Sequence, residues 1–114
     1  MVTIQRKGPI SLNKIAFHAM GEPSFVELLY DPDERIVGFR SLKERRPHAY
    51  PVRVQGKGST FLISGHAFVK LYGIPNEVST RYVAEMFGDV LGVDLKQRGT
   101  VVRGNRTGRK KAAP

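Results

Sequence analysis

The basic string Gln5-Arg6-Lys7-Gly8 recurs later in the chain as Gln55-Gly56-Lys57-Gly58. Similar residues follow the two strings in the same order: Leu12, Ala16-Phe17, Gly21, Pro23 and Gly38 after the first, and Ile63, Ala67-Phe68, Gly73, Pro75 and Gly92 after the second. Ordered self-similarity of this kind indicates that one supersecondary unit occurs twice. We therefore predict an internal duplication that carries two similar cationic turns.

Length and composition favour a single domain. The chain has 114 residues, 40% of them hydrophobic, which suits one modest core. Two independent domains of half this length would bury too little surface, so the two copies are expected to share a core. We predict one domain over residues 1–98, made of repeats 1–42 and 49–98 with a charged connector at 43–48, and a flexible basic tail over 99–114.

The first repeat reads as a hairpin, a short helix and a second hairpin. Apolar and polar residues alternate on both sides of Lys7-Gly8-Pro9, which is typical of a β-hairpin. Asn13 is a favourable N-cap for a helix whose apolar side is expected to include Ile15, and Gly21 can end that helix in the left-handed conformation. Residues 25–30 and 35–40 then form strands around a proline turn. The predicted order is ββαββ.

The second repeat is expected to follow the same order. Its predicted strands and helix are residues 49–54, 60–64, 65–72 (the helix), 80–87 and 90–95. Residues 80–87 are ambiguous, since Val78, Tyr82 and Met86 have helical spacing. The repeat favours a strand there, with Gly88-Asp89 as a tight hairpin turn. The fold class is therefore α+β, with two tandem ββαββ-like units packed as one domain.

The charge balance points to a polyanionic partner. Lys and Arg number 19 against 10 Asp and Glu, which gives a net charge of +9 and a pI near 10.3. Five of these cations lie after Val102, where the sequence contains no acid. A basic chain with a clustered basic tail is typical of nucleic-acid-binding proteins, although basic residues also serve as plain solubilising charge.

The candidate DNA-binding residues are the cations beside the glycine turns and those of the tail. They are Arg6, Lys7, Lys14, Arg53, Lys57, Arg103, Arg106, Arg109, Lys110 and Lys111. We expect the two turns to project from neighbouring hairpins on one face and to contact phosphates, while Gly-flanked Arg side chains of the tail can enter a narrow minor groove. A solvated hairpin tip is the alternative for each turn.

The order hairpin, short helix, hairpin resembles the swapped-hairpin AbrB family. The residues that carry this resemblance are 3–14, 26–31 and 36–40, and two copies in one chain are similar to the MraZ arrangement. The resemblance implies duplex DNA binding by a regulator or antitoxin. Pro9 stands where the family has Arg, which moves the expected contacts to Arg6, Lys7 and Lys57. The chain is more faintly similar to small basic DNA-binding proteins of actinobacteria and their phages.

Other classes of function find little support in the sequence. There is no cysteine, the three histidines lack metal-ligand spacing, and no catalytic constellation or phosphate loop is present. We expect no enzyme activity, cofactor, small-molecule substrate or membrane span, and a cytoplasmic location at the nucleoid. The leading function is duplex DNA binding of low to moderate sequence specificity. A protein-interaction module, such as an antitoxin-like or phage-encoded inhibitor, and an RNA-binding protein are the alternatives, and a homodimer stays open.

Overall fold

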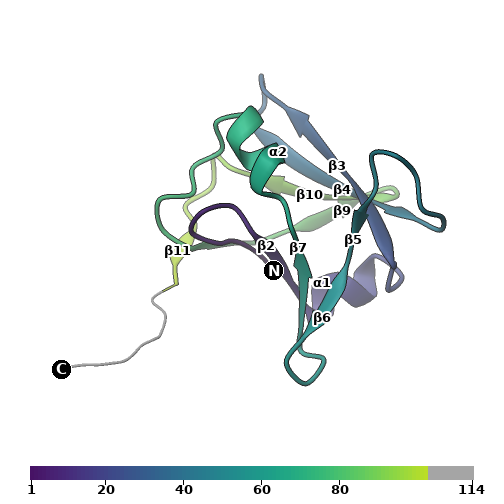
Figure 1. Ribbon diagram of the computed structural model, residues 1–114. Helices are drawn as coiled ribbons and strands as arrows, with labels where there is room; N and C mark the ends of the chain where they lie inside the picture. Colours follow the sequence, from purple (N-terminus) through teal and green to yellow (C-terminus); the bar gives the residue numbers. More distant parts are fainter. Residues whose placement is uncertain (103–114) are drawn as a thin grey trace.

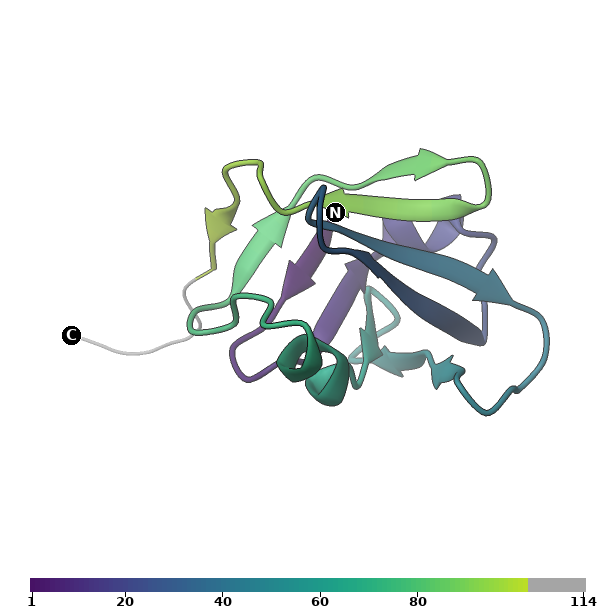
Figure 2. The ribbon, with the colours of Figure 1, turned by 90° about the horizontal axis from the view of Figure 1, so that it is seen from above.

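Two antiparallel sheets and two short helices make up the fold in the computed structural model, which describes residues 1–102 (Figure 1). Sheet A has the strand order β11 (Thr100–Val101), β8 (Thr80–Tyr82), β1 (Val2–Ile4), β2 (Ile10–Asn13), β7 (Thr60–Ile63) and β6 (Arg53–Gln55). Sheet B has the order β5 (Tyr50–Pro51), β3 (Phe25–Asp31), β4 (Ile36–Leu42), β10 (Val90–Asp94) and β9 (Glu85–Phe87). Viewed from above, the strands of the two sheets run at an angle to one another (Figure 2). The predicted mixed α and β fold is confirmed at this level.

One hydrophobic core lies between the sheets. Alternate residues of β1, Val2 and Ile4, are almost fully buried, whereas Thr3 between them points to the other face. Sheet B contributes Phe39 and Val93, both at 0% exposure, to the same cluster. This period of two places every second side chain of a strand in the core. The two sheets are therefore held together by a shared core.

Both helices are short and end in the same way. Helix α1 (Lys14–Ala19) begins at Asn13, whose Oδ1 accepts a hydrogen bond from the Ala16 N–H at 2.9 Å, as predicted. After it, the N–H groups of Gly21 and Glu22 bond back to carbonyls of the last turn. Helix α2 (His66–Leu71) repeats this pattern, and Gly21 and Gly73 both have positive φ. Such Schellman endings satisfy carbonyls that a helix end leaves free.

One helix residue departs from its predicted environment. We expected Ile15 on the apolar side of α1, but its exposure is 76%. Within α1 and its C-cap, the buried residues are Ala16 and Met20, which lie four residues apart on one side of the helix. Ile15 precedes Ala16 and points away from that side.

Two predicted strands are each divided between the sheets. The segment 49–54 forms β5 in sheet B and β6 in sheet A, with Val52 between them. The segment 80–87 is extended, as favoured, but Val83 and Ala84 separate β8 of sheet A from β9 of sheet B. Each break is the place where the chain passes from one layer to the other. Strand prediction along the sequence does not reveal which sheet a residue joins.

Two strand pairs connect the N-terminal and C-terminal parts of the chain. In sheet A, β2 pairs with β7, and Ile10 lies opposite Ile63. In sheet B, β4 pairs with β10, and Gly38 lies opposite Gly92. Beyond the predicted domain boundary at residue 98, Thr100–Val101 still adds β11 to sheet A. The flexibility predicted for the rest of the tail concerns residues outside the described part of the chain.

Candidate nucleic-acid interface

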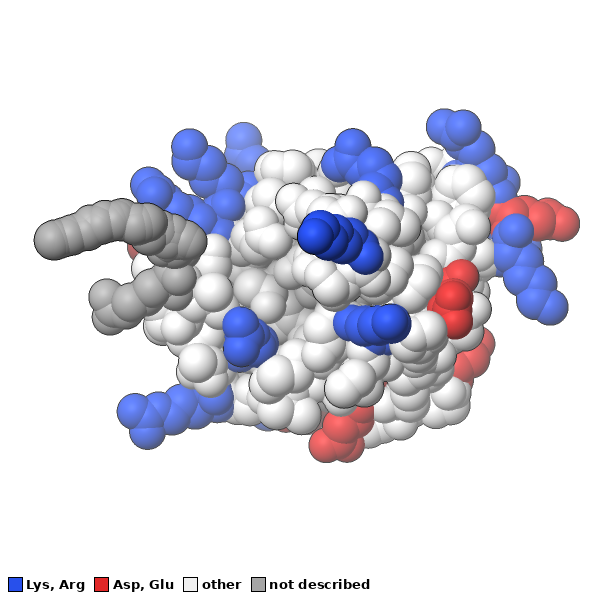
Figure 3. All heavy atoms as spheres, turned by 90° about the horizontal axis from the view of Figure 1, so that it is seen from below, with Lys and Arg blue, Asp and Glu red and all other residues white. Residues whose placement is uncertain are grey.

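Charge is divided between the two sheets. The six strands of sheet A and their turns at 5–9 and 56–59 contain no Asp or Glu, and their cations are Arg6, Lys7, Arg53, Lys57 and Arg81. The strands of sheet B and their turns at 32–35 and 88–89 contain two cations, Arg35 and Arg40, and the acids Glu27, Asp31, Asp33, Glu34, Glu85, Asp89 and Asp94. In Figure 3, which shows the molecule from below, Lys and Arg are spread over the whole view, while Asp and Glu gather mainly toward the right. Sheet A is therefore the basic layer.

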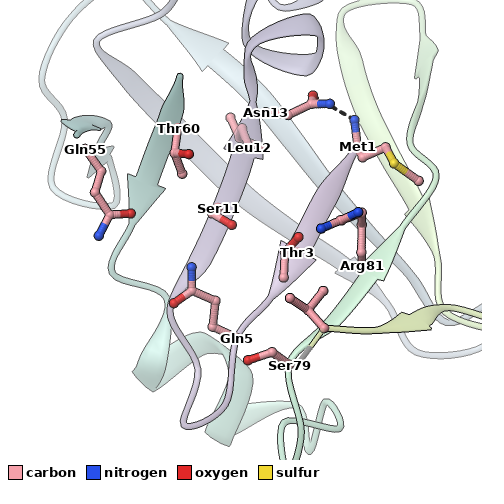
Figure 4. A pocket seen from close by; sticks show the side chains of 11 residues that line it. Met1, Thr3, Gln5, Ser11, Leu12, Asn13, Gln55, Thr60, Ser79 and Arg81 are labelled. Atoms are coloured by element: carbon pink, nitrogen blue, oxygen red, sulfur yellow. Dashed lines mark hydrogen bonds between the residues drawn. The ribbon is translucent and has the colours of Figure 1, made fainter. Parts of the chain in front are cut away.

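The outer face of sheet A presents uncharged side chains, most of them polar, between two arginines. Strand register aligns Arg81 with Thr3, Thr3 with Ser11, Ser11 with Leu62 and Leu62 with Arg53. Four strand spacings of about 4.8 Å separate the arginines, or roughly 19 Å. This face is hollowed by about 410 Å³, and Figure 4 shows its hydroxyl and amide groups. They belong to Thr3, Gln5, Ser11, Asn13, Gln55, Thr60 and Ser79.

Both arginines of this row have defined surroundings. The Arg53 Nη2 donates a hydrogen bond to the Ser64 Oγ at 2.8 Å, which holds the guanidinium along the sheet. Arg81 lies near the Met1 amino group, which donates to the Asn13 Oδ1 at 2.8 Å (Figure 4). Burial lowers the pKa of this amino group, and the positive charge of Arg81 lowers it further. An anion placed here would be favoured because it relieves repulsion between cations.

The β1–β2 turn is fixed by neighbouring segments of the chain. The Lys7 N–H donates to the Asn76 carbonyl at 3.1 Å, and the Arg6 N–H donates to the Ser79 Oγ at 2.9 Å. Lys7 has a φ of 75° and Gly8 a φ of 109°. A Cβ on Gly8 would lie 2.9 Å from the His66 Cα, so only glycine fits between this turn and α2. The turn thus presents its two cations from a held backbone.

The two hairpins are neighbours in sheet A, as predicted, because β2 pairs with β7, but their cationic turns lie at opposite ends of the sheet. Because β2 and β7 are antiparallel, the turn before β2 lies near Ile63, and the turn before β7 lies near Asn13. Lys7 is consequently at one end of the strand pair and Lys57 at the other. Lys14 directly follows Asn13, which pairs with Thr60, so the structure brings Lys14 to the end that holds Lys57.

The predicted tail cations follow directly from the edge of this face. The positions Arg103, Arg106, Arg109, Lys110 and Lys111 fall outside the described residues. The described chain stops at Val102, which lines the hollow and donates its N–H to the Ser79 carbonyl at 2.8 Å. Ser79 also accepts the Arg6 N–H. The tail therefore begins at the end of sheet A that carries Arg6 and Lys7.

Sequence reasoning missed Arg81 and the polar row beside it. Exposed and buried side chains alternate along β8, so Arg81 points to the outer face of the sheet while the next residue, Tyr82, is buried. The change from a charged to an aromatic residue is a signal that the sequence already contained. Its position on the interface depends on the pairing of β8 with β1, which joins distant parts of the chain. The predicted cations of the body were chosen mainly for their proximity to glycine turns, whereas Arg81 lies within a strand.

Comparison with protein-family models, with curated proteins and with solved structures found no match for this chain. Within residues 1–102, no three His, Asp or Glu side chains are grouped so that they could hold a metal ion. No helix in the same range has the length and apolar character needed to cross a membrane. The resemblance to the AbrB family thus stays a prediction from sequence.

Proposed function

We propose that this protein binds duplex DNA through the outer face of sheet A, with low to moderate sequence specificity. The observation that carries the proposal is the separation of charge: sheet A and its turns are cationic and free of acid, while acids collect on sheet B. A cationic face draws in a polyanion at long range, and phosphate contacts supply affinity that does not depend on sequence. A role as a small regulator or an architectural protein of the nucleoid follows from such binding.

The polar row on this face favours a duplex over a single strand. Proteins that hold single strands usually stack bases on exposed aromatic rings. The strongly exposed aromatic side chains of the described chain, Tyr72 and Phe87, belong to α2 and β9. Thr3, Gln5 and Gln55 instead offer hydroxyl and amide groups suited to phosphate and sugar oxygens. Contacts of this type position a duplex without reading its bases.

We also propose that the chain consists of two copies of a ββαββ unit, in an arrangement similar to that of the AbrB and MraZ proteins. Three observations support a duplication. The strands that correspond in the repeat, β2 with β7 and β4 with β10, are antiparallel partners. Gly38 and Gly92, which correspond in sequence, lie opposite one another. Both helices end in the same hydrogen-bond pattern. Such pairings are expected when two copies are related by a local twofold axis.

The test is the affinity for duplex DNA, single strands and duplex RNA across a salt series, for the natural chain and for Arg53→Gln/Arg81→Gln. Each lost phosphate contact should lower the salt slope by about 0.9, so this variant should bind duplex DNA on the order of 50-fold more weakly near 0.1 M salt. Arg45→Gln/Arg46→Gln removes the same charge from the connector between β4 and β5 and is the matched control. We expect it to change affinity by less than about threefold.

Three results would contradict the proposal. The first is an equal loss of affinity in both variants, which would indicate a response to net charge alone. The second is stronger binding to duplex RNA than to DNA, which would favour the RNA-binding alternative. The third is no measurable affinity for any nucleic acid at low salt, together with tight binding to one protein, which would select the protein-interaction module.

A further inference from the structure

We infer that strand β9 (Glu85–Phe87) is a docking edge for an extended, basic segment of a partner protein. The segment pairs with the free side of β9 as an added strand of sheet B, and one of its cationic side chains enters a hollow beside Glu85 and Phe87. This inference concerns the layer across the core from the proposed DNA interface, and it does not depend on DNA binding.

Strand β9 ends sheet B and has one free side. Its only neighbour among the described strands is β10, and all three of its residues are exposed. In Figure 2 the light-green β9–β10 hairpin runs along the upper border of the molecule. Sheet edges are often protected by proline or by a cation, as Pro51 does in β5 and Arg53 in β6, but β9 contains neither. Its backbone is therefore open to an added strand.

A hollow of about 300 Å³ adjoins this edge on the outer face of sheet B. It is lined by Ile36, Val83 and Phe87 and by Gly92, which has no side chain. A Cβ on Gly92 would lie 2.7 Å from two carbons of the Phe87 ring, so the ring lies against this glycine. Apolar walls of this kind suit the aliphatic stem of a lysine or arginine, and the exposed ring can also attract its charge.

Two carboxylates at the hollow favour a cation. Glu85 and Asp94 both line it. Asp94 is already paired with Lys96 at 3.2 Å, whereas Glu85 forms no ion pair with any Lys, Arg or His of residues 1–102. The strands and turns of sheet B carry seven acids against two cations. This edge is therefore complementary in charge to a basic partner, although the chain as a whole is basic.

Strand register specifies which partner side chains lie where. Glu85 is opposite Gly92 and Phe87 is opposite Val90, so both point to the outer face, while Met86 lies between them and points to the other side. An added strand continues this alternation. Its cations would lie beside Glu85 and its apolar side chains beside Met86. We therefore expect a partner segment in which basic and apolar residues alternate.

A second copy of this chain is a less suitable occupant. Pairing of β9 with β9 of another copy would bring two acid-bearing edges together, and like charges across an interface are unfavourable. The same acids attract a basic strand. Charge complementarity therefore favours a basic segment of another protein over self-association at this edge.

The test titrates two blocked synthetic peptides of equal length into the labelled full chain, one alternating arginine with valine and the other alternating glutamate with valine. We expect the basic peptide to bind on the order of tenfold more tightly. It should shift the amides of β9, Val83 and Gly92 most, and should slow hydrogen exchange within β9. The same basic peptide with every backbone amide methylated keeps its charge but cannot donate to the edge, and should lose most of this affinity.

Two variants locate the contact. Glu85→Gln removes the carboxylate with little change in shape and should weaken the basic peptide by on the order of tenfold. Glu44→Gln removes one acid from the connector between β4 and β5 and is the matched control, with an expected change of less than about twofold. Phe87→Ala removes a wall of the hollow from an exposed position and should also weaken the peptide.

Several results would overturn the inference. They are absence of binding by the basic peptide, equal affinity for both peptides, an equal loss in Glu85→Gln and Glu44→Gln, and shifts confined to strands other than β9 and β10. Self-association of the chain that shifts the β9 amides and excludes the peptide would overturn it as well. None of these results bears on duplex binding by sheet A, so the proposed function would stand or fall separately.

Discussion

Sheets A and B are built from similar hairpins, yet their outer faces have opposite character. On sheet A, Thr3 and Ser11 lie between Arg81 and Arg53, and the layer carries no acid. On sheet B, the outer face is centred on Gly38 and Gly92, which are covered by apolar side chains such as Val90 and Phe87, and acids surround it. The inner faces of both sheets contribute apolar side chains to one core. The core therefore determines stability for the whole chain, while the outer faces determine which sheet meets a polyanion.

The largest expected effect tests whether the two sheets share one core. Phe39→Ala removes a side chain of sheet B that is fully buried, and large-to-small changes of this kind cost about 3–5 kcal/mol. We expect sheet A to unfold in the same transition, measured by denaturant unfolding with probes in both sheets. Thr3→Ala, on the outer face of sheet A, is the control and should cost less than about 1 kcal/mol. Separate transitions for the two sheets would contradict the shared core.

A second comparison concerns the two glycine turns of sheet A. Gly58 has a φ of 84° and open space around it, so Gly58→Ala should cost only the left-handed strain of about 1–2 kcal/mol. Gly8→Ala adds a clash with the backbone of His66 and should cost about 1–3 kcal/mol more. Thermal or denaturant unfolding of both variants measures the difference. Equal costs would mean that the β1–β2 turn does not pack against α2 as described.

Local signals in the sequence predicted much of this fold. The turns at Lys7-Gly8-Pro9 and Gly88-Asp89 and the helix ends at Gly21 and Gly73 were found because glycine and proline restrict the backbone where they stand. The cations of the two turns were found in the same way. These features depend on neighbours in sequence, which a single chain displays directly.

Features that depend on distant partners were not predictable. The chain leaves sheet B for sheet A at Val52, whose N–H bonds the Ser24 carbonyl. It leaves sheet A for sheet B at Val83. The Val83 N–H donates to the Gln97 Oε1, and the Gln97 Nε2 donates to the Val83 carbonyl. None of these three bonds follows from alternation or propensity. The opposed positions of Lys7 and Lys57 have the same origin, because they follow from the antiparallel pairing of β2 with β7.

A smaller effect separates the two helices. Asn13 caps α1 through its side chain, whereas Gly65 at the start of α2 makes no side-chain cap. Asn13→Ala should therefore cost about 1 kcal/mol, and Asn13→Ser should recover most of this, since serine is also a good N-cap. Chemical denaturation of the two variants provides the measurement. An undiminished stability in Asn13→Ala would show that this bond contributes nothing to α1.

The smallest expected effect concerns the acids of sheet B. Asp33→Asn/Glu85→Gln removes two negative charges from the layer that lies across the core from the proposed interface. Packed sheets are about 10 Å apart and the screening length at physiological salt is about 8 Å, so duplex affinity should change by less than about twofold. A titration at that salt concentration measures it. A change as large as that of Arg53→Gln/Arg81→Gln would place the ligand on both layers or on sheet B.

The most direct test of the basic-layer proposal is the map of backbone amide chemical shifts as duplex DNA is titrated into the labelled full chain. We predict that the largest changes fall on β8, β1, β2, β7 and β6 and on their two turns, centred on Arg81, Thr3 and Arg53. Amides of β3, β4 and β10 should change little, apart from those that contact the edges of sheet A. Largest changes on the outer face of sheet B, around Val90 and Phe87, would contradict the account.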